Sequence, residues 1–325
     1  MKLKKCAALL LVSSCLLTGC TTSSAKKVDS KYVVASLEKG NKTKNIFADN
    51  LYKDIIDNSS NNSTVFNAVL QNLVDQKLKE DAATIIKQIK SAYKSNYGDN
   101  YKDSLNQALT SAGYKNLSEY RQRMIKQIQY ANFLLDYIDD HFDDVFNDYY
   151  QQCAPKYVSL IKISVSDTSS PTDDETSKLN EVKELISNTD KSFGDIAQDY
   201  SDDSTSSKKG SLGIVDSKDT SGIANSYGKD VFNAIEALSE GQVSDVITGD
   251  DGYYFVKITS TDKKTLKKEL KKTDIDSPLL AYDDYLQYVV YNSYKINYKD
   301  KDIKKIVQEV VNKALEERKT ERGEA

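Results

Sequence analysis

The chain has 325 residues, which is enough for about two or three domains, and 39% of them are hydrophobic, which is enough to build packed cores. It contains only three prolines and no tryptophan, a composition that favours long helices over a turn-rich β-sandwich. Because His141 is the single histidine, a metal site built from several histidines of this chain is excluded. We expect no bound metal and no cofactor.

The first nineteen residues have the features of an export signal. Three lysines near the start precede an apolar run from Cys6 to Leu17, which is too short to span a bilayer. The run ends in Leu17-Thr18-Gly19-Cys20, which resembles the lipobox of bacterial lipoproteins. An ordinary secretory signal with an accidental cysteine is the alternative interpretation.

The lipobox resemblance implies an anchor and a location. Residues 1–19 would be a signal peptide that is removed, and Cys20 would become the first residue and carry the acyl chains, palmitate among them. Residues 20–30 are then expected to form a flexible tether, since they begin with small and polar side chains. The protein would be anchored to the cell membrane on its extracellular face.

Cysteine usage and charge agree with export. Cys6 and Cys15 leave with the leader and Cys20 is used for lipid, so Cys153 remains without an intrachain partner and no disulfide framework is expected. Acidic residues outnumber basic ones, 49 to 45, and removal of the leader takes away lysines only. This balance argues against nucleic acid as a partner, because phosphate binding needs a basic patch.

The two outer parts of the chain have a mainly helical pattern. Residues 32–37 have the composition of one short strand, and apolar residues then recur at helical spacing over 46–150. Within this region one long helix is expected over 118–145. After residue 263 the helical pattern resumes, most strongly over 279–290 and 303–315.

Pro155 marks a change of class in the middle of the chain, because β-branched and aromatic segments alternate with short helical ones after it. We expect strands over 157–165 and 252–258, helices over 179–186, 193–200 and 232–238, and a loop over 201–213.

The middle part also carries short motifs at fixed spacing. The first two are Phe193-x-x-Ile196-Ala197-x-x-Tyr200-Ser201-x-Asp203 and Gly210-x-Leu212-Gly213, and the later two are Ala234-x-x-Ala237-Leu238-x-x-Gly241-x-Val243-Ser244 and Gly252-Tyr253-x-x-Val256-Lys257. In this order they resemble the parvulin (PpiC-type) family of peptidyl-prolyl isomerases. With a lipobox in front and helical segments on both sides, the chain resembles a PrsA-type foldase lipoprotein.

This resemblance implies an α+β fold in which a helical chaperone body, made from the N- and C-terminal segments, carries an inserted parvulin-like domain. The expected boundaries are 31–155 for the N-terminal helical segment, 156–260 for the parvulin-like domain and 261–325 for the C-terminal segment that completes the body. An insertion of this kind requires the two ends of the inserted domain to lie close together.

The chain departs from active parvulins at three polar positions. The family carries histidines where this sequence has Leu160 and Tyr254, and an acidic residue where it has Ser211. The family's activity is peptidyl-prolyl cis-trans isomerisation, and its catalytic residues are unassigned here. We expect this rotamase activity to be weak or lost and peptide binding to be retained. The alternative is that the hydroxyl of Ser211 or Tyr254 donates the hydrogen bond that catalysis needs.

Two further features have alternative interpretations. His141 lies among acidic residues, which suits either a metal or pH-sensitive site or, more commonly, a solvated acidic helix face. The 22 tyrosines against eight phenylalanines suit adaptable polypeptide binding, and compositional drift explains them equally well.

The favoured function is a membrane-anchored extracellular foldase that assists secreted proteins after translocation, with unfolded secreted polypeptides as partners. The sequence does not name the client proteins and leaves the oligomeric state open, with a dimer as one option. The alternative is a solute-binding lipoprotein of an importer, which shares the anchor and requires two α/β lobes of repeated βαβ units.

Overall fold

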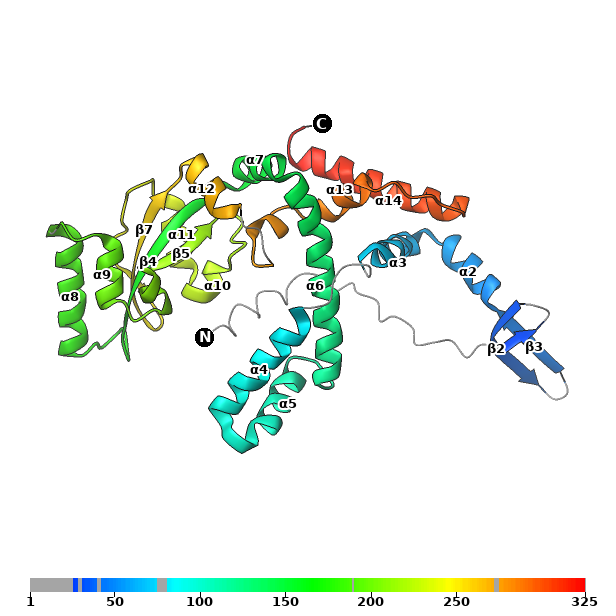
Figure 1. Ribbon diagram of the computed structural model, residues 1–325, viewed down its shortest axis with the longest axis horizontal. Helices are drawn as coiled ribbons and strands as arrows, with labels where there is room; N and C mark the ends of the chain where they lie inside the picture. The colour runs from blue at the N-terminus through cyan, green and yellow to red at the C-terminus, as the bar shows by residue number, and fades with distance from the viewer. Residues whose placement is uncertain are drawn as a thin grey trace. The chain divides into compact units, whose positions relative to one another are not determined.

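The computed structural model describes residues 26–28, 31–39, 42–74, 81–188, 190–271 and 275–324. The predicted signal peptide and Cys20 lie outside these ranges. The chain divides into two compact units, which we call the sheet unit (residues 135–284) and the helical unit (the described residues up to 134 together with 285–324) (Figure 1). Among the described helices, none is long and apolar enough to cross a bilayer.

The helical unit begins with a small antiparallel sheet in the order β1-β2-β3. The sequence predicted one strand here and a tether up to residue 30, whereas β1 falls inside that stretch. Ile46 and Phe47, expected to start the helical region, are the last residues of β3, because the strand pairs with β2 from Lys39↔Lys42 onward. The bounds of the elements in this unit are β1 Lys26–Val28, β2 Lys31–Lys39, β3 Lys42–Phe47, α2 Ala48–Ile56, α3 Asn62–Val74, α4 Asp81–Tyr97, α5 Tyr101–Ser111, the first part of α6 Leu117–Asp140, α13 Leu286–Ser293 and α14 Lys301–Glu321, with short 3₁₀ turns at Ser59–Asn61 and Gly98–Asn100.

Segments from the two ends of the chain form one core in the helical unit. The fully buried ring of Phe66 in α3 stacks on Tyr288 in α13 with 5.0 Å between the ring centroids, and meets Tyr291 edge-on at 5.1 Å. The Tyr52 hydroxyl in α2 donates a hydrogen bond of 2.5 Å to Asp300, which precedes α14. This confirms the expected α+β fold class with a helical body drawn from both terminal segments.

The sheet unit is built on four antiparallel strands in the order β5-β4-β7-β6. Both described sheets are antiparallel throughout, so within the described residues there are no repeated βαβ units of the kind that an importer's binding protein requires. The elements of this unit are α7 Phe142–Cys153, β4 Lys156–Ser164, α8 Asp173–Asn188, α9 Phe193–Tyr200, β5 Ser211–Val215, α10 Ile223–Tyr227, α11 Lys229–Ala237, β6 Ile247–Gly249, β7 Gly252–Ser260 and α12 Lys263–Leu270, with 3₁₀ turns at Ser204–Lys208 and Pro278–Leu280.

Strand alternation gives this sheet a buried layer on each face. Leu160 of β4 packs with α10 and α11 on one face, while its neighbour Ile161 packs with α8 and α9 on the other. Figure 1 shows α8 and α9 together on one side of the strands. Because both faces are covered, the central strands are apolar at successive positions.

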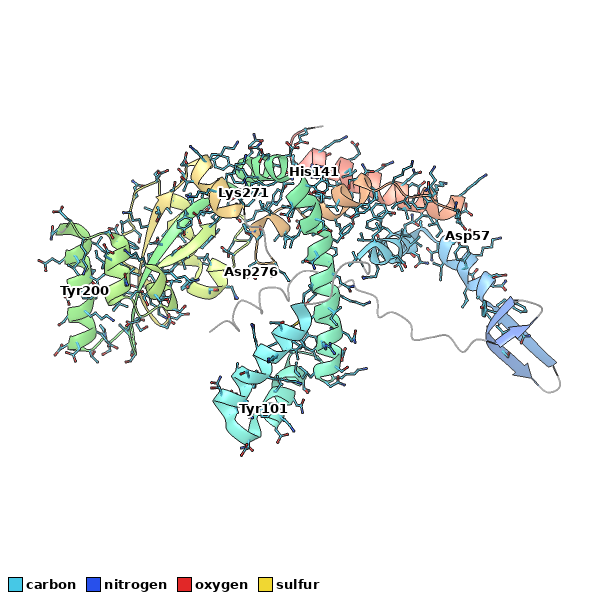
Figure 2. All side chains as sticks on the ribbon, in the orientation of Figure 1. Asp57, Tyr101, His141, Tyr200, Lys271 and Asp276 are labelled. Atoms are coloured by element: carbon cyan, nitrogen blue, oxygen red, sulfur yellow. The ribbon has the colours of Figure 1, made fainter. Side chains whose placement is uncertain are left out.

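Three predictions about helices and loops in the chain are wrong. The long helix expected through residue 145 ends at Asp140, and His141, at φ −121° and ψ 28°, separates α6 from α7 (Figure 2). No proline or glycine marks this break in the sequence. The loop expected over 201–213 contains a 3₁₀ turn and the start of β5. The stretch 279–290 is divided between a 3₁₀ turn and α13.

A buried carboxylate ties α7 to the loop after β5. Asp216 is fully buried and accepts a hydrogen bond of 2.9 Å from the Tyr149 hydroxyl, one from the Thr220 hydroxyl, and one of 3.0 Å from the backbone N–H of Lys218. The compact unit is therefore wider than β4 to β7, whose outer ends are Lys156 and Ser260.

Candidate functional site

Leu160, the first of the three positions at which the sequence departs from active parvulins, is a core residue. It lies in the middle of β4 opposite Val256 of β7, and none of its side chain is exposed. Its backbone N–H donates to the carbonyl of Gly210 at 2.8 Å. Gly210 has φ +75°, and a Cβ there would meet the Leu160 carbonyl oxygen at 2.5 Å, which explains the glycine of the second motif.

The second position, Tyr254, lies on the same face of the sheet as Leu160 and is 2% exposed. Its hydroxyl donates to the carboxylate of Asp251, which also forms an ion pair with Lys162. The Lys162 ammonium lies 5.6 Å from the centroid of the Tyr254 ring, within cation–π range. Burial, followed by the hydrogen bond to Asp251, raises the pKa of Tyr254 well above its ordinary value, so the phenol stays protonated.

A second tyrosine completes this layer. The ring of Tyr227, at the end of α10, meets that of Tyr254 edge-on with 6.2 Å between centroids. Its hydroxyl donates to Asp203 at 3.4 Å, and Asp203 also accepts the backbone N–H of Thr205 at 2.8 Å to cap the following 3₁₀ turn. Burial, with Asp203 adding to it, raises the pKa of Tyr227.

The third position, Ser211, does not join this group. It begins β5 and pairs with Ser159, on the face of the strand pair away from Leu160. Its hydroxyl donates to the hydroxyl of Tyr157 at 2.9 Å and accepts the backbone N–H of Gly213 at 3.3 Å. The structure therefore brings Leu160 and Tyr254 together and keeps Ser211 apart from them.

The sequence analysis did not predict the side chains that contact the polar groups of this site. Asp251 and Lys162 reach Tyr254 from a turn and from the neighbouring strand, and Tyr227 comes from a helix that was not predicted. Asp203 was part of a quoted motif without an assigned role. The only available signal was the closeness of Asp251 to the last strand.

The remaining candidate residues are His141 and Cys153. The His141 ring stacks on Tyr137 with 4.2 Å between centroids, and its Nδ1 lies 3.0 Å from the Tyr137 carbonyl oxygen. Across the described ranges no three histidine, cysteine or acidic side chains are grouped so that they could hold a metal ion. Cys153 is a free, buried thiol.

Part of the sheet unit is similar to a known domain family. The PPIC-type rotamase domain family matches residues 160–260. This stretch is therefore similar to parvulin-type domains. The foldase protein PrsA of Staphylococcus aureus (strain MRSA252) is 32% identical over 141 residues, which cover 41% of this chain and 41% of the relative. PrsA of Staphylococcus epidermidis (strain RP62A) shows the same identity and coverage. These matches confirm the resemblance to PrsA-type foldases.

The chain spans 41% of the length of these curated relatives. Among solved structures, PrsA of Bacillus subtilis is similar with a TM-score of 0.38 and 22% identity, covering 85% of this chain and 98% of the other. PrsA of Streptococcus pneumoniae has a TM-score of 0.38 and 19% identity, covering 85% of this chain and 99% of the other.

Proposed function

We propose that the chain is a membrane-anchored extracellular foldase that assists the folding of secreted proteins, and that its parvulin-type domain binds polypeptide with little or no isomerase activity. The similarity to PrsA foldases supports the first part of this proposal. The expected lipobox supports the anchor, with Cys20 as the lipidated residue. Unfolded secreted polypeptides are the proposed partners.

One observation carries the catalytic part of the proposal: the hydroxyls left at the family's polar positions already have partners. Tyr254 donates to Asp251 and Ser211 donates to Tyr157, while Leu160 adds only an apolar surface. An isomerase must lower a rotation barrier of about 18–20 kcal/mol by stabilising a twisted imide. A hydroxyl that gives up an internal hydrogen bond to do so loses most of the gain.

Refolding of a protein whose slow phase is a prolyl isomerisation tests this directly. The wild-type chain is expected to accelerate that phase weakly or not at all, and Tyr254→Phe and Ser211→Ala are expected to leave the rate unchanged. The same preparations should suppress aggregation of an unrelated unfolding protein. A parvulin that carries both histidines serves as the positive control. A wild-type rate close to this control, abolished by either substitution, would show that a hydroxyl has replaced the imidazoles.

The anchor needs a separate test. Replacing Cys20 with alanine is expected to leave the leader unprocessed at this site and to remove acyl chains from the product, measured by mass spectrometry of the detergent phase. A Cys20→Ala protein that is processed and partitions into detergent like the wild type contradicts lipidation at this residue.

A further inference from the structure

One face of the helix α2 is apolar and exposed. Leu51, Tyr52 and Ile55 lie at adjoining positions of this nine-residue helix, and their exposed fractions are 44%, 44% and 45%. No residue of α2 is buried, although the helix is amphipathic. With Tyr32 of β2, four of the six large apolar side chains that are exposed within the described residues come from residues 32–55. Such a concentration indicates an interaction surface.

The pairing of the strands brings the start of the sheet β1-β2-β3 close to the start of α2. Lys26 of β1 pairs with Val33 of β2, and Val33 pairs in turn with Phe47, the residue that precedes α2. Neighbouring strands lie about 5 Å apart, so the backbone of Lys26 is about 10 Å from that of Phe47. Figure 1 shows α2 leaving this sheet at the end of β3. The chain therefore enters the sheet at the level at which α2 begins.

The proposed lipid attachment site is close to this end of the sheet in the sequence. Cys20 precedes Lys26 by six residues, and a chain of that length reaches at most about 20 Å when fully extended. Acyl chains on Cys20 would therefore keep the start of α2 within about 30 Å of the bilayer surface. A helix of nine residues is too short to span a bilayer, but it can lie in the interface with its apolar face towards the acyl chains.

The sequence of this sheet is basic, although the chain as a whole is acidic. Residues 26–44 contain six lysines against two acidic residues, Asp29 and Glu38. Two of these lysines, Lys26 and Lys27, form the part of β1 that pairs next to the start of α2. The charged residues of α2 lie outside its apolar arc, and they are Asp49, Lys53 and Asp54. An excess of lysine beside an apolar helix face favours an anionic lipid surface.

We propose that α2 docks on an anionic lipid surface, with Leu51, Tyr52 and Ile55 towards the acyl chains and the lysines of β1 near the headgroups. The hydroxyl of Tyr52 already donates to Asp300, so its ring can leave water without an unpaired O–H. Three apolar side chains bind weakly by themselves, and an anchor raises their effective concentration at the bilayer. The inference rests on the proposed lipid anchor and names the surface that the anchored helical unit contacts.

Because the chain has no tryptophan, a single introduced one reports on this face. The full chain with Leu51→Trp is reconstituted with vesicles of phosphatidylglycerol or phosphatidylcholine that have brominated acyl chains. We expect its fluorescence to be blue-shifted and quenched by the brominated phosphatidylglycerol, and to be quenched less by the phosphatidylcholine. Tyr97→Trp, at an exposed position of α4, is the control and should show neither change. Equal quenching of the two reporters, or no quenching of the first, overturns the inference.

Charge removal in β1 has a matched control in the same unit. Lys26→Gln together with Lys27→Gln, added to the Leu51→Trp chain, is expected to lower the ratio of docked to undocked protein on phosphatidylglycerol about 25-fold, or about fivefold per lysine. Lys313→Gln together with Lys319→Gln removes two exposed lysines of α14 and should leave the quenching unchanged. Equal effects of the two double substitutions overturn the inference.

Flotation of the same samples with phosphatidylcholine vesicles separates this inference from the anchor. Flotation without quenching of the Leu51→Trp reporter leaves the anchor standing and overturns the docking. Loss of flotation with retained quenching on phosphatidylglycerol contradicts the anchor and supports docking by α2 itself. A blue shift without quenching by bromine assigns the face to a contact with a second copy of the chain, and this result also overturns the inference.

Discussion

The two units of this chain place their tyrosine hydroxyls in different surroundings. In the sheet unit, the polar groups around Tyr254 are paired with one another, through Asp251 and Lys162. In the helical unit, the hydroxyls of Tyr291 and Tyr298 bond to each other at 2.6 Å beside a hollow that both residues line. The polar groups around Tyr254 are thus closed among themselves, whereas the tyrosines at the end of α13 line a hollow.

The core of the sheet unit explains how Leu160 fits into β4. The core of the sheet unit consists of apolar side chains on both faces, and Leu160 extends it. Replacing a buried imidazole with an aliphatic side chain removes a polar group that needs a partner, so the exchange does not cost stability through an unsatisfied hydrogen bond.

The largest expected effect is a loss of stability when a buried ring is removed from the core of the helical unit. Phe66→Ala removes a fully buried ring that contacts Tyr288 and Tyr291, and we expect it to destabilise the helical unit by about 3–5 kcal/mol. Hydrogen exchange should rise throughout this unit and stay low in the sheet unit. Tyr97→Ala, at a side chain that is 53% exposed, is the control and should change neither. Equal loss of protection in both units would contradict the assignment of Phe66 to the core of the helical unit.

The converse experiment uses Asp216. Asp216→Ala leaves the hydroxyls of Tyr149 and Thr220 without their buried acceptor, and we expect the free energy of unfolding of the sheet unit to fall by about 3 kcal/mol. Chemical denaturation, monitored by hydrogen exchange, measures this free energy. Asp245→Ala, at an exposed carboxylate of the same unit, is the control. Equal loss of hydrogen-exchange protection in the helical unit would contradict this assignment.

A smaller effect is expected at Lys156, which caps α11. Its ammonium donates to the carbonyl oxygens of Ile235 at 2.9 Å, Glu236 at 2.7 Å and Leu238 at 3.0 Å, which lie at the end of that helix. Lys156→Met keeps the apolar stem and removes these bonds, so we expect a loss of about 1 kcal/mol in the sheet unit alone. Thermal unfolding compared with that of Lys264→Met measures it. An unchanged melting temperature would mean that water replaces the ammonium at no cost.

The smallest effect depends on pH. The backbone N–H groups of Thr172 and Ser166 donate to the carboxylate of Glu175, at 2.7 and 2.8 Å, and lower its pKa to about 2. A lowered pKa means that this stabilisation is present above the ordinary value of 4.5 and is lost as the pH falls towards 2. Glu175→Gln should therefore lower the melting temperature at neutral pH and flatten its dependence on pH between these values. Glu184→Gln is the exposed control, and a parallel pH profile for the two variants would refute the assignment.

Local patterns predicted the elements whose signals lie within a short stretch of sequence. The helix over 193–200 is α9 with the expected bounds, and the strands expected at 157–165 and 252–258 are β4 and β7 within two residues. β5 was missed because its sequence, Ser-Leu-Gly-Ile-Val, follows a polar loop and becomes a strand only by pairing with β4. The break at His141 also has no local signal.

The candidate site was predictable only in part, for a related reason. Motif spacing placed Leu160 and Tyr254 in the first and last strands, where the structure has them. Asp251, which accepts the hydrogen bond from the Tyr254 hydroxyl, comes from a turn. Tyr227, whose ring contacts that of Tyr254, comes from a helix that was not predicted. Hydrogen-bond partners are chosen by tertiary packing, which a single sequence does not reveal.

The pairing of Tyr157 with Ser260 has a mechanical consequence. The chain enters β4 and leaves β7 at the same end of this antiparallel pair, so tension between the two connections acts across the strands. Such a load reaches the backbone hydrogen bonds one after another, beginning at Tyr157 and Ser260, instead of shearing all of them at once. A force-spectroscopy experiment that pulls on the chain from α7 and α12 should therefore open the domain at low force, by unzipping from this end.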